Sequence, residues 1–252
     1  MGDSETEARS TIVITRTADR VVVQLNRPEV RNAINQQMVD ELHELCSELE
    51  ADPRILIITG SEGVFASGAD IAELQERTSA DALKGINTML FIRVSELPMP
   101  VIAAIDGYAL GGGAELAFAA DFRIGTPRVK FGNPETGLGI VAPAGALWRL
   151  RELVGEPLAK EVLLAGRILG AEEAMAARLL TRVVEPAELL AAAHALADEI
   201  AAKSVAATIQ TKAIMRVDRG RHPEADLAAQ AVLFDSDEKR QLMTAFLERK
   251  KK

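Results

Sequence analysis

Two glutamates and two glycine-containing turns are the residues of this sequence whose types and spacing suit chemistry. Glu115 comes just after the triple glycine Gly111–Gly113, and a second acid, Glu135, follows Pro134. A helix that begins at a glycine turn leaves backbone N–H groups unpaired at its N-terminus, and glycine lets a ligand approach them because it has no Cβ. The sequence therefore predicts donors for a developing oxyanion, with Glu115 as an acid or base beside them.

A second turn of the same kind lies earlier in the chain, in the segment that ends in Gly68-Ala69-Asp70. Two such turns can supply one N–H each to a single oxygen, which is a more specific arrangement than either turn alone. The alternative interpretation is that both are ordinary strand-to-helix turns, which any α/β protein contains.

The two carboxylates have different sequence surroundings. Glu115 is followed by Leu116, Ala117 and Phe118, so we expect it to be buried with a raised pKa. Its alternative role is that of an acid that interacts with the dipole at a helix N-terminus. Glu135 lies in a loop rich in glycine and proline, and taken alone it is more simply explained as a solvent-exposed acid. Paired acids near an oxyanion site would suit addition or removal of water next to a carbonyl.

The elements that must position these residues follow from hydrophobic periodicity. The apolar run Val101–Ile105 has the length and β-branching of a buried strand that leads into the triple glycine. The other expected strands are residues 11–15, 20–25, 55–59, 122–125 and 128–131, and residues 132–139 are expected to form a loop. The expected helices are residues 36–49, 70–74 with Asp70 as N-cap, 80–97, 114–120, 145–152, 156–165, 171–177, 186–202, 205–217, 223–234 and 236–250. Strands in the first half and helices in the second predict an α/β fold.

Composition excludes several classes of function. A formal net charge of −8 over 252 residues argues against a nucleic-acid binder. The single cysteine, Cys46, lies in a helical pattern and is expected to be buried; it allows no internal disulfide and no multi-cysteine metal site. No apolar stretch reaches the roughly 18 residues of a membrane span, and the acidic residues 1–10 are expected to form a disordered tail. These features predict a cytoplasmic protein.

Three segments resemble the signature segments of the enoyl-CoA hydratase/isomerase (crotonase) family. They are Phe65–Ile71, Asp106–Glu115 and Phe131–Glu135. The segments Asn26–Ala33 and Asp237–Glu248 are similar to that family too, so the resemblance runs from about residue 11 to the C-terminus. The motifs together are specific to the superfamily and less specific to one reaction, because the fold hosts several.

The resemblance implies an α/β fold in which ββα units form a spiral. The core would span residues 11–190, and residues 191–252 would form a helical region that builds homotrimers or hexamers, the latter as dimers of trimers. The ligand would be an acyl-CoA thioester. No metal and no redox cofactor would be needed, because the thioester is activated once its oxygen is polarised, and coenzyme A is part of the substrate.

The family's site residues carry over onto matching positions of this sequence. The N–H groups of Ala69 and Gly112 would form the oxyanion pair. Glu115 would help to activate water for attack at Cβ, and Glu135 would exchange the proton at Cα. The coenzyme A portion would contact Val30, Arg31, Ala33, Ala66, Asp70 and Ile71, and Phe246 and Arg249 from a neighbouring subunit. The expected reaction is hydration of a trans-2-enoyl-CoA to a 3-hydroxyacyl-CoA.

One departure from the family pattern bears on the reaction. The family usually has Leu-x-x-x-Pro-Gly-x-Gly-Gly after the second glutamate, whereas Pro143 falls where the family has a glycine whose N–H helps to hold the water. Proline has no N–H. Either the loop shifts by a residue, or the two acids hold the water alone, or the substrate differs. The alternatives to a hydratase are therefore an enoyl-CoA isomerase that moves a double bond and a non-catalytic acyl-CoA-binding protein.

Overall fold

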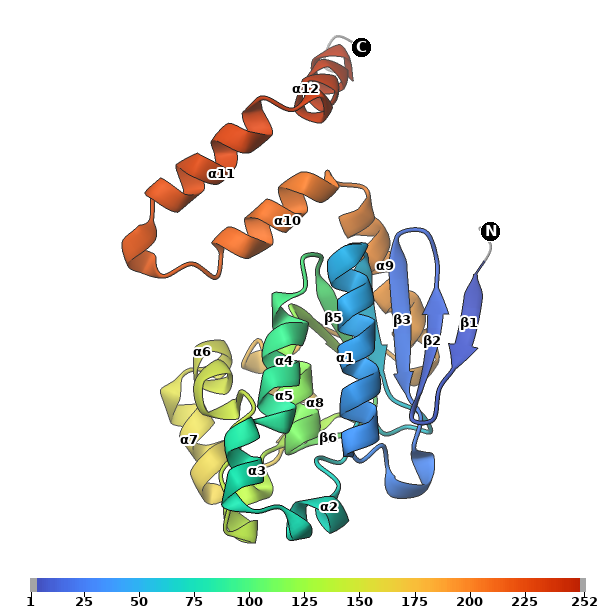
Figure 1. Cartoon of the computed structure of the whole chain (residues 1–252), viewed down its shortest axis with the longest axis vertical. Coiled ribbons are helices and arrows are strands. Elements are labelled where there is room, and N and C mark those ends of the chain that lie inside the picture. The colour runs from blue at the N-terminus through green and yellow to red at the C-terminus, as the bar shows by residue number, and fades with distance from the viewer. Residues whose placement is uncertain (1–3, 250–252) are drawn as a thin grey trace. The chain divides into compact units, whose positions relative to one another are not determined.

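The computed structural model describes residues 4–249, which divide into a first unit up to Ala197 and a second from Asp198. The first unit contains a seven-stranded sheet (Figure 1). Its strands in spatial order are β1 (Glu5–Ala8), β2 (Ile12–Arg16), β3 (Arg20–Leu25), β4 (Ile55–Thr59), β5 (Val101–Ile105), β7 (Phe122–Gly125) and β10 (Arg182–Val183). The pairs from β3 to β10 are parallel, and β1, β2 and β3 pair antiparallel.

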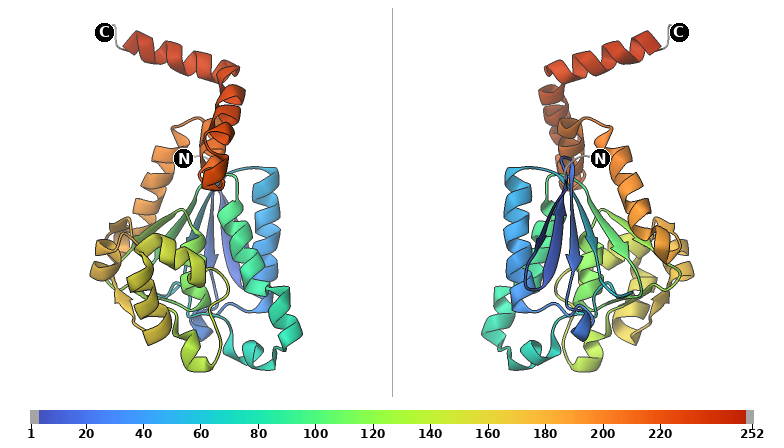
Figure 2. Two further views of the ribbon diagram at one scale, coloured as in Figure 1. Left: turned by 90° about the vertical axis from the view of Figure 1, so that its left-hand side faces the viewer. Right: turned by 90° about the vertical axis from the view of Figure 1, so that its right-hand side faces the viewer.

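Helices cover both faces of this sheet, which explains why β4 and β5 are buried along their whole length and apolar at every position except Thr59. Figure 2 shows α1 on one side of the strands and the part of α9 up to Ala197 on the other. The first unit's helices are α1 (Gln36–Ala51), α2 (Ile71–Glu76), α3 (Ser79–Lys84), α4 (Ile86–Glu96), α5 (Gly112–Ala119), α6 (Arg151–Val154), α7 (Glu156–Ala165), α8 (Ala171–Ala176) and the start of α9 (Leu189–Ala201). Short helical turns are η1 (Pro28–Val30), η2 (Pro134–Leu138), the π-helical η3 (Ala146–Leu150) and η4 (Pro186–Glu188).

A small second sheet supplies the second strand of the ββα unit that begins with β5. Its strands are β6 (Tyr108–Leu110), β8 (Lys130–Gly132) and β9 (Leu169–Gly170), in the order β6-β8-β9. The chain runs from β5 in the large sheet to β6 in the small one and then into α5. Ala66 forms a parallel bridge with Ala109, so the segment after β4 takes the same path before α2. Repetition of this path brings both glycine turns to the same end of the large sheet.

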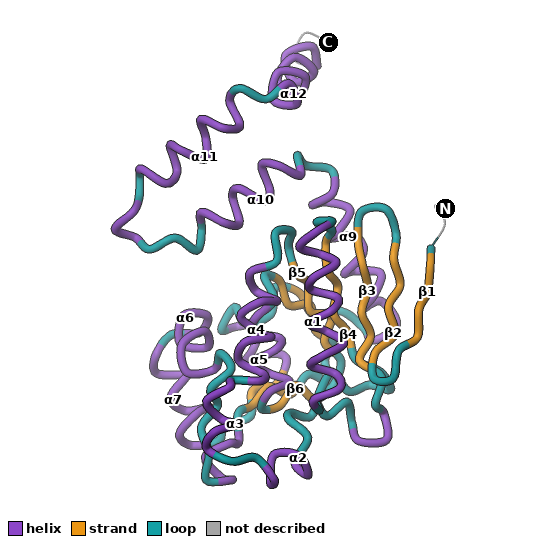
Figure 3. Tube along the Cα trace, viewed as in Figure 1, coloured by secondary structure: helices purple, strands orange, loops and turns teal. Residues whose placement is uncertain are grey.

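The second unit is helical over its described residues (Figure 3). It contains the end of α9, α10 (Val205–Ile214), η5 (Arg219–Arg221), α11 (Glu224–Phe234) and α12 (Asp237–Arg249). Within it, Ser204 Oγ donates to Glu238 Oε2 at 2.6 Å, and Lys239 Nζ lies 4.7 Å from the centre of the Phe234 ring. The division between the units falls a few residues after the predicted boundary at 190/191.

Some sequence predictions about elements were wrong. The predicted disordered tail contains β1, which pairs antiparallel with β2 and has no large apolar residue. Glu7 in this strand forms ion pairs with Arg9 and Arg16 at 2.7 Å each. Residues 1–3 lie outside the described part. The predicted helix 80–97 is two helices, because Gly85 adopts a left-handed conformation with φ 63° between α3 and α4.

Other predicted elements were confirmed. The strands 20–25, 55–59, 101–105 and 122–125 and the helix 156–165 have the predicted bounds. The predicted helix 145–152 is the π-helical η3 followed by α6, and the predicted helix 186–202 is η4 followed by α9. The remaining predicted strands and helices were found with shifted ends. The loop 132–139 contains η2. Strands β6 and β9 were missed because each has only two or three residues. Across the described residues, no helix is both long enough and apolar enough to span a membrane.

Candidate active site

The two predicted donors of the oxyanion pair are neighbours. Gly112 begins α5, where no helical carbonyl one turn earlier can accept its N–H. The N–H of Ala69 donates to no acceptor among the described backbone bonds, although its neighbour Asp70 donates to Ile34 at 2.9 Å. A Cβ on Gly112 would lie 3.4 Å from the nitrogen of Ala69. Neither N–H therefore donates to a backbone acceptor among the described residues, and the two groups are neighbours, whereas their role as an oxyanion pair stays a prediction.

Glu115 is buried on the first turn of α5, with only 3% of its surface exposed. Its Oε1 accepts the N–H of Ala144 at 2.7 Å and the N–H of Ala146 at 3.2 Å. Burial raises its pKa to about 8; the charge of Glu135 adds to this, and the two backbone N–H groups oppose it. The prediction of a buried acid with a raised pKa was confirmed.

Glu135 is also buried, at 9% exposed, so the interpretation as a solvent-exposed loop acid was wrong. The turn η2 points it inward, and Asn133 Nδ2 lies 3.4 Å from its Oε1. Burial raises the pKa of this carboxyl as well. Its Oε2 is buried without a hydrogen-bond partner among residues 4–249. A buried acceptor without a donor is costly, which is typical of a position that a ligand completes.

The second carboxylate lies beside the glycine turns. A Cβ on Gly111 would lie 3.1 Å from Glu135 Oε1 and 3.7 Å from the Cα of Gly68. Gly111 itself has φ 51°, a conformation that favours glycine. Two available N–H groups and two buried, interacting acids therefore share one site. This arrangement can hold a negative oxygen and move protons next to it.

The six first-unit residues predicted to contact coenzyme A lie on two adjacent segments. Ser67 N donates to Arg31 O at 3.1 Å, and Ile34 N donates to Gly68 O at 2.8 Å, so residues 30–34 run beside 66–71. Of the six predicted residues, Val30, Arg31 and Ile71 are exposed, and Ala33 and Ala66 are buried.

Asp70 makes contacts that hold the two segments 30–34 and 66–71 in place. It caps α2 by accepting the N–H of Ala72, and its carboxylate pairs with Arg27 at 3.0 Å. Arg27, which sequence reasoning missed, also donates to Ala33 O at 2.7 Å and so ties the two segments together. Phe246 and Arg249 lie on α12 in the second unit, and their contact with a ligand stays a prediction.

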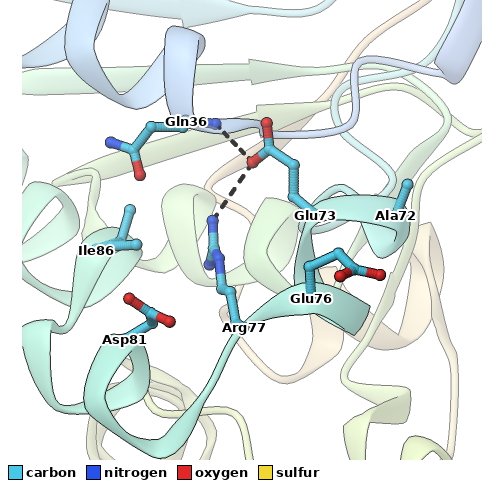
Figure 4. A pocket seen from close by; sticks show the side chains of 7 residues that line it. All are labelled: Gln36, Ala72, Glu73, Glu76, Arg77, Asp81 and Ile86. Atoms are coloured by element: carbon cyan, nitrogen blue, oxygen red, sulfur yellow. Dashed lines mark hydrogen bonds and ion pairs between the residues drawn. The ribbon is translucent and has the colours of Figure 1, made fainter.

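A surface cavity lies among α1, α2, α3 and α4 (Figure 4). Glu73 Oε2 there accepts the N–H of Gln36 at 2.8 Å and lies 3.5 Å from Arg77 Nη2, while Ile86 adds an apolar side chain. None of the four predicted catalytic residues lines this cavity. The segment predicted as one helix, residues 80–97, reaches this cavity through Asp81 and Ile86.

Other candidate groups in the sequence form no second site. Cys46 is buried and burial raises its pKa to about 12, which is typical of an inert packed thiol. Among residues 4–249, no cluster of three or more His, Cys, Asp or Glu side chains could hold a metal ion. Sequence reasoning also missed the N–H donors of Ala144 and Ala146, because nothing in the loop's sequence shows which atoms they contact.

Comparisons with known proteins identify the family of this chain. The family model described as Enoyl-CoA hydratase/isomerase matches residues 16–252. The chain is 36% identical to the short-chain-enoyl-CoA hydratase of Clostridium acetobutylicum over 95% of both chains, and 36% identical to the crotonyl-CoA hydratase of Syntrophomonas wolfei over 97% of both. The crystal structure of an enoyl-CoA hydratase from Bacillus anthracis superimposes with a TM-score of 0.90 at 31% identity, over 95% of this chain and 97% of that one.

These findings show that the chain belongs to the enoyl-CoA hydratase/isomerase family and has the crotonase fold. The buried acids and the paired glycine turns lie on the segments that carried the resemblance in sequence.

The raised pKa of Glu115 predicts a pH-dependent stability difference. The folded state binds this proton more tightly than the unfolded state, whose carboxyl has the ordinary value of 4.5. Its contribution to stability is complete below pH 4.5 and is lost as the pH rises through about 8. Glu115→Gln should therefore become more stable relative to wild type between pH 5 and 8, by up to about 4 kcal/mol. Urea unfolding at both pH values measures the free energy of unfolding of the two proteins. A difference between them that stays the same at pH 5 and pH 8 would contradict a buried acid with a raised pKa.

Proposed function

We propose that this protein is an enoyl-CoA hydratase that adds water reversibly to a trans-2-enoyl-CoA to give a 3-hydroxyacyl-CoA. The observation that carries the proposal is the presence of two buried acids beside two available backbone N–H groups. The printed names of the Clostridium and Syntrophomonas relatives support the same reaction.

The N–H groups of Ala69 and Gly112 hold the thioester oxygen. When the oxygen of water bonds to Cβ, the π electrons move toward the thioester and its oxygen becomes negative. Fixed donors at that oxygen stabilise the transition state more than the ground state, and the loss of one such donor typically costs about 3 kcal/mol. Gly112 is also the first residue of α5, so the helix dipole adds to the effect.

The two acids carry the protons. Glu115 accepts one proton from the attacking water, and Glu135 donates one to Cα, so one molecule of water is added and the pair keeps its single proton. Hydration neither releases nor consumes a proton, so both directions require the same protonation state of the pair. The raised pKa values of both acids, caused by burial, favour retention of that one proton near neutral pH.

Pro143 does not prevent this mechanism. It supplies no N–H, but the next available N–H groups in the loop, from Ala144 and Ala146, donate to Glu115 Oε1. The carbonyl of Pro143 accepts the hydroxyl of Thr88 at 3.3 Å. The loop therefore fixes the acid, and we infer that the two carboxylates hold the water without a donor from position 143. The proline at position 143, where the family has a glycine, also keeps an enoyl-CoA isomerase as the second candidate, because isomerisation needs no water.

We also propose that the second unit assembles this chain into homotrimers or hexamers. Its helices α11 and α12 expose large apolar side chains at 48–67% of their surface, namely Leu227, Val232, Phe234, Leu242, Met243, Phe246 and Leu247. Contact with further copies of the chain would remove this apolar surface from water.

The hydratase assignment predicts loss of the enoyl-thioester absorbance band with crotonyl-CoA. We expect the wild type to remove this band quickly. Glu115→Gln should remove it at least about a hundredfold more slowly, because the variant cannot accept the proton of water. Glu135→Gln should be similarly slow. No loss with any chain length despite binding would contradict hydration, and migration of a 3-enoyl double bond by the same protein would then favour the isomerase.

The role assigned to the loop predicts a contrast between two neighbouring substitutions. Ala144→Pro removes the N–H that donates to Glu115 Oε1 at 2.7 Å, so the pKa of Glu115 should rise. The rate of hydration should then fall about tenfold. Pro143→Gly restores an N–H and should change the rate less than about threefold, because the acids hold the water. Rate–pH profiles and circular dichroism of both variants measure this. A large gain from Pro143→Gly would show that the water lacks a donor in the natural chain.

The assembly proposal predicts three or six times the mass of one chain in light scattering after gel filtration. Leu242→Asp should shift the wild-type assembly toward monomer, since it places a charge on the apolar face of α12. Leu164→Asp makes the same change at a side chain that is 71% exposed in the first unit and should leave the mass unchanged. A monomeric wild type would contradict the proposal.

A further inference from the structure

Asn87, on the first turn of α4, is a polar side chain with no role in the mechanism proposed for the two acids. Its Oδ1 is buried without a hydrogen-bond partner within residues 4–249. Its Nδ2 lies 3.4 Å from the point where a Cβ of Gly112 would be. The nitrogen of Ala69 is 3.4 Å from the same point. The Asn87 amide nitrogen and the nitrogen of Ala69 therefore both lie close to Gly112, on whose N–H the oxyanion pair depends.

The surrounding structure fixes Asn87 in this position. The left-handed turn at Gly85 starts α4 beside the site, and Leu90 and Phe91 anchor the helix in the core. The next residue, Thr88, donates its hydroxyl to the carbonyl of Pro143. The start of α4 is thus tied to the loop that holds Glu115, so the amide can keep its orientation without a bond of its own.

We propose that Asn87 is a catalytic residue whose side-chain amide donates a third hydrogen bond to the thioester oxygen. This inference rests on the proposed function of the site. The amide N–H₂ has two protons to donate, and a negative oxygen can accept from several donors at once. The third donor would act mainly in the transition state, when charge develops on that oxygen, so it would affect kcat more than KM.

The rival explanation is that Asn87 only limits the acyl chain. A polar side chain at the wall of an acyl pocket would disfavour long saturated tails through the cost of leaving its amide unpaired. Under that explanation Asn87→Leu would speed the reaction of longer enoyl-CoAs and leave crotonyl-CoA nearly unchanged. The two explanations therefore predict opposite results for the same variant.

The test uses Asn87→Leu and Asn87→Asp in the full-length protein. Leucine removes the donor at similar size, and aspartate places acceptor oxygens against the developing charge. We expect kcat for crotonyl-CoA to fall about ten- to a hundredfold in both variants, with KM within about threefold of wild type. Asn26→Asp makes the same chemical change at an exposed position and should match the wild type.

A second readout separates this inference from the proposed function. A conjugated aryl-enoyl-CoA absorbs at longer wavelength when its thioester oxygen is polarised, and this can be recorded on binding without turnover. The wild type should produce the red shift and Asn87→Leu should reduce it. A wild type that shifts the band but hydrates no ester would contradict the proposed function alone. A full shift and normal kcat in Asn87→Leu, or faster turnover of longer chains only, would overturn the role of Asn87.

Discussion

The site depends on the close approach of two backbone segments that side chains would prevent. A Cβ on Gly113 would lie 2.3 Å from the carbonyl oxygen of Ala66, and one on Gly107 would lie 2.0 Å from the carbonyl oxygen of Gly63. Contacts this short exclude any other residue unless the backbone moves. The glycines therefore let the turn before α5 pack against the segment after β4, and that packing places the nitrogens of Ala69 and Gly112 beside one another.

Around this packed backbone the protein keeps groups that would be more stable in water. Glu115 and Glu135 are buried and interact, and one oxygen of Glu135 has no partner among the described residues. The rest of the first unit must offset this cost, and the continuous apolar core from the large sheet to α1, α4 and α5 provides the burial that does so. Because the folded scaffold already holds the acids and N–H groups in place, a substrate would meet them without further rearrangement.

The sequence predicted the parts of this arrangement that follow from local patterns. A fully buried strand such as Val101–Ile105 can be predicted because it is a continuous apolar run, and the triple glycine indicates the start of α5. The burial of Glu135 could not be read from a loop of glycine and proline, because it depends on packing of η2 against the turn at Gly111. The strand at Glu5–Ala8 was hidden since ion pairs rather than apolar residues hold it.

The position of Asn87 shows the same limit. It lies within a stretch that reads as one helix, whereas the structure has a break at Gly85 and places the amide of Asn87 near Gly112. Resemblance to a family located Ala69, Gly112, Glu115 and Glu135, whereas the contacts specific to this chain came from the folded structure. Those contacts include the donation from Ala144 and Ala146 to Glu115, which gives the loop with Pro143 a role that its sequence did not indicate.

The central claim is that one thioester oxygen binds between the two glycine turns, next to both acids. A crystal structure with butyryl-CoA tests it most directly, since this saturated ester has no double bond to hydrate. We expect its carbonyl oxygen about 2.9 Å from the nitrogens of both Ala69 and Gly112, with Cα and Cβ facing Glu135 and Glu115. A thioester oxygen that contacts neither nitrogen, or an acyl group bound away from both acids, would contradict the account.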